Sequence, residues 1–156
     1  MSIVLDTSGT VYPTHYKESL NFVNRILSII DISPETSRAG VTTFATKADV
    51  RIFCDQHTSS ETLEKAIIGL PYTYTGLSAR HTNLREGLVK GQQVLTGRGC
   101  GRLNAKQIIV LISDGIANIG KGGNLRHYIK HPYLSPSEKK LCKISYEIKL
   151  LQIRKK

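Results

Sequence analysis

Four oxygen-bearing side chains stand in two separated stretches of this sequence and suit the binding of a hard cation. Asp6, Ser8 and Thr10 alternate in the first stretch, and Asp114 follows in the second. Alternation lets a semi-extended loop aim the first three at one point. Mg²⁺ and similar ions take oxygen ligands, and a site with only two carboxylates neutralises a divalent ion less fully than a carboxylate cage, so that an anion can complete the coordination. The pattern indicates a divalent-cation site that accepts a carboxylate.

The two aspartates end apolar runs that are typical of buried strands. Residues 2–5 predict a short strand that ends at Asp6, and the near-continuous apolar run 108–112 predicts a central parallel strand with helices on both faces. In open α/β sheets the ligand crevice lies at the carboxyl ends of such strands. We therefore expect Asp6 and Asp114 to face the same site.

The remaining patterns predict helices and one hairpin around these strands. Residues 40–45 and 50–53 are rich in β-branched and aromatic residues and predict two strands joined by a hairpin. Helical spacing predicts three helices: one from Pro13 to about Ile30, one capped at Thr58 and ended by Pro71, and one from about Asn83 to the glycine-rich residues 97–101. The fold class is α/β, a Rossmann-like three-layer sandwich with a mostly parallel central sheet and one antiparallel edge hairpin.

Three motifs carry a resemblance to a known family. Residues 3–10, IVLDTSGT, resemble the opening strand and D-x-S-x-S motif of von Willebrand factor A and integrin I domains, with Thr10 in place of a serine. Residues 76–88 are similar to the family's glycine, T-N-T, A-L segment, with Leu84 in place of the second threonine. Residues 109–115 resemble the strand that ends in T-D-G. The motifs occur in the family's order, so the resemblance covers residues 3 to about 120.

The resemblance implies a metal-ion-dependent adhesion site rather than an enzyme. Ser8, Thr10 and, in the ligand-bound state, Thr82 would contact the cation directly, while Asp6 and Asp114 would act mainly through water. The ion would be Mg²⁺, or Mn²⁺ or Ca²⁺, and a Glu or Asp of a protein ligand would take the open position. The family also implies an extracellular or cell-surface protein whose partner is collagen or another matrix protein.

The resemblance divides the chain into two parts. Residues 1–120 are expected to form the von Willebrand factor A-like domain, and residues 121–156 a basic tail that is divergent or poorly ordered. The family's later strands find no match after Gly120, so we expect the sheet to be truncated after its fourth strand, with an unpaired edge beside residues 108–112. The spacing of Leu141, Ile144, Ile148 and Leu151 favours a short amphipathic helix over a strand.

Composition and charge limit the other possibilities. A chain of 156 residues with 40% hydrophobic content fits one domain. No apolar run is long enough to span a membrane, and no signal peptide follows Met1. Ten basic residues against two acids lie from Lys121 onward, so most of the net charge of +10 belongs to the tail and gives the domain no basic face for nucleic acid.

Alternative interpretations stay open at three places. Asp6 to Val11 also resembles the D-x-D-G-T nucleophile loop of haloacid dehalogenase-type phosphohydrolases, in which Asp6 would be the nucleophile, although Ser8 stands where that family has its general acid. A metal-free von Willebrand factor A scaffold is the third possibility. Cys54, Cys100 and Cys142 fit either one disulfide with an odd thiol or three free thiols. His81 adjoins Thr82 and is a candidate for the border of the ligand surface.

Overall fold

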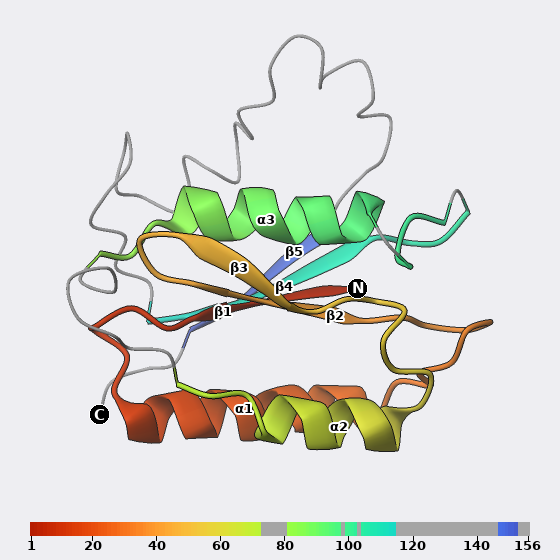
Figure 1. Cartoon of the computed structure of the whole chain (residues 1–156), viewed down its shortest axis with the longest axis horizontal. Helices are drawn as coiled ribbons and strands as arrows, with labels where there is room; N and C mark the ends of the chain where they lie inside the picture. The colour runs from red at the N-terminus through yellow and green to blue at the C-terminus, as the bar shows by residue number, and fades with distance from the viewer. Residues whose placement is uncertain (73–80, 98, 103, 115–146, 153–156) are drawn as a thin grey trace, which may run out of the picture.

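The chain folds into three layers, with a β-sheet between two layers of helices (Figure 1). The computed structural model describes residues 1–72, 81–97, 99–102, 104–114 and the backbone of 147–152. In chain order the elements are β1 (Ser2–Asp6), α1 (Pro13–Leu27), β2 (Gly40–Phe44), β3 (Ala48–Ile52), α2 (Ser60–Ile68), α3 (Leu84–Thr96), β4 (Ile108–Ser113) and β5 (Glu147–Gln152).

The sheet is mostly parallel, as the sequence predicts. Its spatial order is β3-β2-β1-β4-β5. β1 pairs in parallel with β2 on one side and β4 on the other, β5 is parallel to β4, and β3 forms the antiparallel edge hairpin with β2. The chain leaves β1 in one direction towards β2 and later returns to its other side as β4, which makes the carboxyl ends of β1 and β4 a topological switch point. Leu5 pairs with Ile112, so Asp6 and Ser113 stand at the same level.

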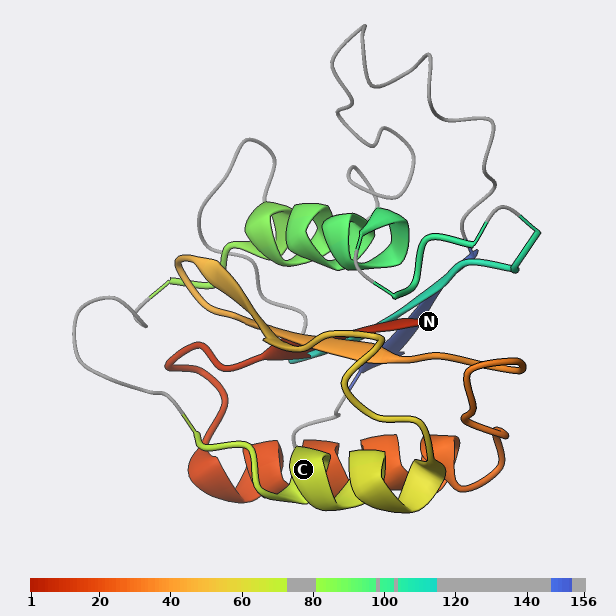
Figure 2. The same ribbon diagram turned by 45° about the vertical axis from the view of Figure 1, so that its right-hand side comes forward.

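The two faces of the sheet have separate apolar cores. α1 and α2 cover one face and α3 covers the other (Figures 1 and 2). Because successive side chains of a strand point to opposite faces, Leu5 packs with Val23 and Leu63 on the α1 and α2 side, whereas Val4 packs with Phe44 and other residues beneath α3. β1 and β4 are covered on both faces, which explains their near-continuous apolar sequences.

α3 approaches the sheet closely through two glycines. A Cβ at Gly87 would lie 2.7 Å from the ring of Phe44, and one at Gly91 would lie 2.5 Å from Cγ2 of Val4. Only hydrogen fits in these positions. The close approach fixes the amino end of α3, and with it Thr82, beside the carboxyl end of β1.

The helices begin near the predicted residues. Pro13 occupies the first turn of α1, where its missing N–H costs nothing, but α1 ends at Leu27 rather than near Ile30. α2 is capped by Ser59, whose side chain accepts from the backbone N–H of Thr62, so the predicted cap at Thr58 is wrong by one residue. Asn83 caps α3 by accepting from the N–H of Glu86 at 3.3 Å.

Residues 147–152 correct the expected truncation. We expected an unpaired edge beside β4, but β5 pairs along its whole length, from Ile108 opposite Glu147 to Ser113 opposite Gln152. The helix expected around Ile148 and Leu151 is therefore wrong for this segment, and residues 141–146 lie outside the described part. Backbone pairing decides the outcome because β4 would otherwise present a row of unpaired donors and acceptors.

A disulfide joins Cys54, just after β3, to Cys100, in the loop after α3. Their Cα atoms are 5.3 Å apart, and 46 positions separate them in the sequence. Of the two arrangements that the sequence left open, this bond fits the one with a single disulfide. Cys142 lies outside the described residues. Among the described helices, none is both long and apolar enough to cross a lipid bilayer.

Candidate metal centre

The loop that leaves β1 folds back on its own aspartate. The backbone N–H of Ser8 donates to Asp6 Oδ1 at 2.9 Å, and the N–H of Val11 donates to the carbonyl oxygen of Ser8 at 2.9 Å. Thr7 fixes the loop to the neighbouring strand, because both its N–H and its hydroxyl donate to the carbonyl oxygen of Phe44, at 2.8 and 3.1 Å. Short polar residues favour such turns. As a result Asp6, Ser8 and Thr10 occupy one compact turn.

Three hydroxyl groups from two distant segments meet beside this turn. Ser8 Oγ lies 3.1 Å from Thr10 Oγ1, and Thr82 Oγ1 donates to Ser8 Oγ at 2.8 Å. Ser8 and Thr82 are fully buried, with exposed fractions of 0% and 1%. The predicted convergence of Thr82 on the first motif is thus a feature of the structure.

Asn83 positions Thr82 by binding the β2–β3 hairpin. Its backbone N–H donates to the carbonyl oxygen of Ala45 at 2.8 Å, and its side-chain amide donates to that of Thr46 at 3.3 Å. The same side chain caps α3 through its oxygen. Asn83 is therefore bonded to both the β2–β3 hairpin and α3, and this fixes the position of the adjacent Thr82.

The two carboxylates approach each other at the ends of β1 and β4. Asp6 accepts a hydrogen bond from the Ser113 hydroxyl through Oδ2 at 2.6 Å. Burial raises the pKa of Asp6 above its ordinary value, hydrogen bonds from Ser113 and Ser8 act against this, and the negative charge of Asp114 raises the pKa further. An ionised Asp6 is therefore in an unfavourable place unless a positive charge lies nearby.

The donor set fits a hard divalent cation. Two carboxylates and three hydroxyls supply only oxygen, which is the preference of Mg²⁺, Mn²⁺ and Ca²⁺. Among the described residues no three His, Cys, Asp or Glu side chains gather as a metal cage, so this centre depends on its hydroxyl groups. The burial of Asp6 beside the negative charge of Asp114 is the observation that a cation would explain.

Ser113 is a member of the site that the sequence motifs did not single out. Its hydroxyl contacts Asp6 directly, and the available signal was its place immediately before Asp114 at the end of a buried strand. Of the histidines, His15 stacks edge-on against Tyr12 with ring centroids 5.7 Å apart, and His81 is exposed next to buried Thr82. His57 lines a small cavity with Pro34 and Cys54, beside the disulfide.

Fold and site together define a class: an α/β domain with a hydroxyl-rich carboxylate centre at the switch point of its sheet. The sequence model of the von Willebrand factor type A domain matches residues 1–131, and the chain belongs to this family. The match extends past residue 120, the end of the domain that the sequence predicts. That boundary and the basic tail at 121–156 both stay predictions.

The curated relatives include two human matrilins. The chain is 28% identical to matrilin-4 of Homo sapiens over 83 residues, which cover 51% of this chain and 13% of the relative. It is 21% identical to matrilin-3 of Homo sapiens over 112 residues, or 72% of this chain and 23% of the relative. The chain thus spans less than a quarter of the length of either protein.

Solved structures with the same fold come from distant organisms. Proximal thread matrix protein 1 from the mussel byssus, described with a zinc-occupied MIDAS motif, superposes with a TM-score of 0.71 at 17% identity, over 96% of this chain and 36% of that one. The manganese-loaded TRAP protein of Plasmodium vivax superposes with a TM-score of 0.69 at 19% identity, over 97% and 56%. At these identities the likeness shows the fold.

Proposed function

We propose that this domain is a divalent-cation-dependent protein-binding module of the adhesion type, without catalytic turnover. The observation that carries the proposal is the continuous hydrogen-bonded set at the switch point: Thr10, Ser8 and Thr82 are joined through their hydroxyls, and Ser8, Asp6 and Ser113 through the carboxylate. Three segments that are far apart in sequence supply these groups.

In this proposal each residue has a defined part. Ser8, Thr10 and Thr82 would hold the cation directly, and Asp6 and Asp114 would hold it mainly through water. Bound there, the cation supplies an open position for a Glu or Asp carboxylate of the ligand. Asn83 keeps Thr82 in place by its bonds to Ala45 and Thr46, and Ser113 orients Asp6. No hydroxyl or carboxylate here needs to transfer a proton or attack a substrate.

The surroundings favour a protein ligand. Tyr12 follows the metal-binding turn closely, is 60% exposed and rests edge-on against His15. An exposed aromatic ring with a fixed orientation is a common contact at protein interfaces. The capture of an acidic side chain by the cation would thus be accompanied by apolar contact with its neighbours.

An extracellular matrix setting is part of the proposal. The disulfide between Cys54 and Cys100 fits an oxidising compartment. Similarity to matrilins and to a byssus matrix protein supports the same setting. We propose Mg²⁺ as the ion, with Mn²⁺ or Ca²⁺ as alternatives, and collagen or another matrix protein as the ligand.

Titration calorimetry with MgCl₂ tests the metal centre. Wild type should bind one ion, and Asp114→Ala should lose binding by at least about tenfold because the remaining carboxylate cannot balance a divalent charge. Asp31→Ala is the matched control, since Asp31 is exposed just beyond the end of α1 that lies away from the metal-binding turn. Circular dichroism confirms that both variants are folded. Equal heats for wild type and Asp114→Ala would remove the metal centre from the proposal.

Solid-phase binding tests the ligand. Domain applied to immobilised collagen and to other matrix proteins should be retained in Mg²⁺ and released by EDTA, and Asp114→Ala should not be retained. Retention that is insensitive to EDTA would contradict capture through the cation.

A further inference from the structure

A cavity lies at the amino ends of β1, β2 and β4, the edge of the sheet opposite the metal centre. Its volume is about 250 Å³. Apolar side chains, among them Ile30, Leu95 and Ile108, form part of its wall, and polar side chains form the rest. Ligand pockets in proteins run from roughly 300 to 1,000 Å³, so this cavity suits a molecule of about sugar size rather than a peptide.

The polar side of the cavity carries positive charge. Arg38, Arg102 and Lys106 line it, and no Asp or Glu does so within the described part of the chain. Among the described residues neither arginine forms a salt bridge with a carboxylate, and the hydrogen bonds of both guanidinium groups go to backbone carbonyl oxygens. Carbonyl groups orient a guanidinium without cancelling its charge, so the wall attracts an anion.

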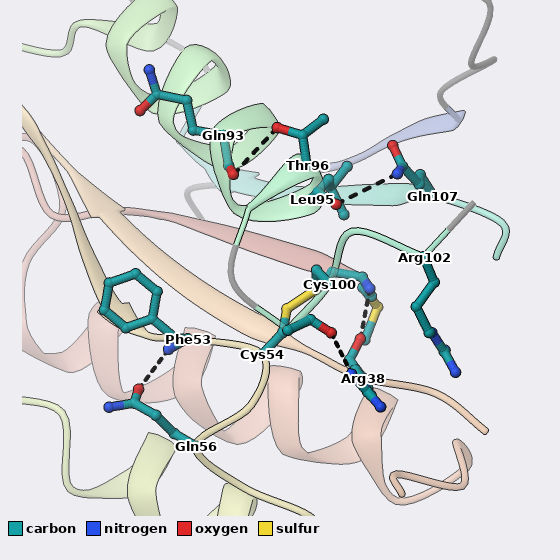
Figure 3. The surroundings of a disulfide bond; sticks show 12 residues. Arg38, Phe53, Cys54, Gln56, Gln93, Leu95, Thr96, Cys100, Arg102 and Gln107 are labelled. Carbon is teal, nitrogen blue, oxygen red and sulfur yellow. Dashed lines mark hydrogen bonds between the residues drawn. A yellow bond between two sulfur atoms is a disulfide. The ribbon is translucent and has the colours of Figure 1, made fainter. Parts of the chain in front are cut away.

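Those carbonyl contacts also fix the two arginines in place. Arg38 donates to the carbonyl oxygen of Pro34 through Nε and Nη2, and to that of Gly99 through Nη1 at 2.8 Å. Arg102 donates to the carbonyl oxygens of residues 34–36. Both side chains lie beside the disulfide, which anchors the Arg102 segment to the end of β3 (Figure 3). Charges fixed before a ligand arrives bind it with a smaller entropic cost.

Gln107 adds a hydrogen-bond acceptor to the cavity, whose basic side chains are donors. It lines the cavity with an exposed fraction of only 5%, and its amide nitrogen donates to the carbonyl oxygen of Leu95 at 3.4 Å (Figure 3). Its amide oxygen has no hydrogen-bond partner among the described residues. A buried acceptor without a donor is costly, and a ligand hydroxyl would satisfy it.

We propose that this cavity binds a small hydroxylated carboxylate, with Arg38, Arg102 and Lys106 around the acid group and Gln107 accepting from a hydroxyl. The site is independent of the metal centre because it occupies the other end of the sheet. It therefore binds in the presence of EDTA.

Sodium D-glucuronate is the probe, and two simpler compounds separate the parts of the proposal. D-glucose keeps the hydroxyl groups without the carboxylate, and sodium propionate keeps the carboxylate without a hydroxyl. Titrations are followed by ¹H–¹⁵N correlation spectra in EDTA, at low ionic strength and without phosphate. Glucuronate should shift the resonances of Arg102, Lys106 and Gln107 and leave Ser8 and Thr82 unmoved. Glucose and propionate should each bind at least about tenfold more weakly.

Charge variants test the same site from the protein side. Arg102→Gln should weaken glucuronate binding about tenfold, since a charge-assisted contact is lost. Lys106→Gln should weaken it about threefold; Lys106 is exposed, so this variant answers the question even if Arg102→Gln does not fold. Lys17→Gln, which removes an equal charge from exposed α1 surface, is the matched control and should bind as wild type does.

Several outcomes would overturn the proposal. Equal binding of glucose and glucuronate would exclude an anion site, and equal binding of propionate and glucuronate would exclude the part assigned to Gln107. Shifts confined to Ser8 and Thr82, or binding that needs Mg²⁺, would place the acid at the metal centre instead. The result for Asp114→Ala in calorimetry does not bear on any of these readings, so the two proposals fail separately.

Discussion

Asp6 is the residue at which stability and the proposed function conflict. Its carboxylate is buried between β1 and β4, near a second acid, and its only described donors are Ser8 and Ser113. Burial is the main cause of its raised pKa, and Asp114 adds to it. Because the folded-state pKa lies above the unfolded value, Asp6 favours the native state at low pH, and that contribution is lost as the pH rises through the folded pKa. Above its folded pKa, the ionised Asp6 therefore no longer makes this contribution to the stability of the metal-free domain.

Asp6→Asn tests this conflict directly. In EDTA at pH 7 the variant should unfold at a temperature at least as high as wild type, because a neutral amide carries no cost of burying a charge and the Ser113 hydroxyl can accept from its N–H. It should also lose the stabilisation that Mg²⁺ gives wild type, which is about 2.7 kcal/mol at 100 times the dissociation constant. Differential scanning fluorimetry with and without MgCl₂ measures both effects. A variant that unfolds well below wild type in EDTA would show that Asp6 serves stability rather than the cation.

Two kinds of signal led to the candidate site residues. Asp6 and Asp114 end apolar runs that are typical of buried strands, whereas Thr82 was found only through the resemblance of residues 76–88 to the family's T-N-T segment. Ser113 was not predicted as a contact of Asp6, because that contact depends on the register between β1 and β4, which no local pattern encodes.

At the scale of elements, local periodicity predicted the helices and strands whose own sequence pattern is distinctive. It failed for the segment whose structure depends on pairing with another strand. The central strands, the hairpin and the three helices are confirmed. The helix predicted around Ile148 and Leu151 was wrong because apolar residues at these positions suit a helical face as well as a strand. Pairing with the edge of β4 decides in favour of the strand. The pairing of Cys54 with Cys100 could not be predicted either, since it depends on two loops that meet only in the folded chain.

α3 offers a test of how closely a helix must lie against the sheet. Gly91→Ala gains about 1 kcal/mol of helix propensity, but its Cβ would meet Cγ2 of Val4 at 2.5 Å. Val4 is a branched, fully buried residue in β1, so it cannot rotate away. Overpacking of this kind costs about 1 to 3 kcal/mol. We therefore expect a net loss of up to about 2 kcal/mol in the free energy of unfolding by urea.

Gly69→Ala is the matched control for that substitution. Gly69 ends α2 with ordinary helical dihedral angles, and its added Cβ would meet backbone oxygens at 3.5 and 3.6 Å, which is normal contact. Its unfolding free energy should stay within about 0.5 kcal/mol of wild type. If Gly91→Ala were as stable as Gly69→Ala, the close approach of α3 to β1 would not be a constraint of the fold.

At the scale of the whole molecule, the two proposed sites occupy opposite ends of one sheet. α3 runs between them, with Thr82 and Asn83 before its first residue and Leu95 in the wall of the cavity near its last. The disulfide closes the chain from the end of β3 to the loop after α3, so α2, Thr82 and α3 all lie within the covalent loop. The covalent loop restricts the unfolded chain, whereas the disulfide bond itself lies at the end of the sheet opposite the carboxylates.

Removal of the disulfide separates its effect on stability from any effect on the metal centre. The double variant Cys54→Ser and Cys100→Ser leaves no new lone thiol and should lose about 2 to 4 kcal/mol of unfolding free energy, since a long loop regains its freedom in the unfolded state. Urea unfolding measures this loss. At a temperature where the variant is folded, its calorimetric affinity for Mg²⁺ should equal that of wild type, because Ser8, Thr82 and Asp114 lie at the other end of the sheet. A large fall in Mg²⁺ affinity in the folded variant would mean that the disulfide also positions the centre through α3, and the separation of the two ends would then be wrong.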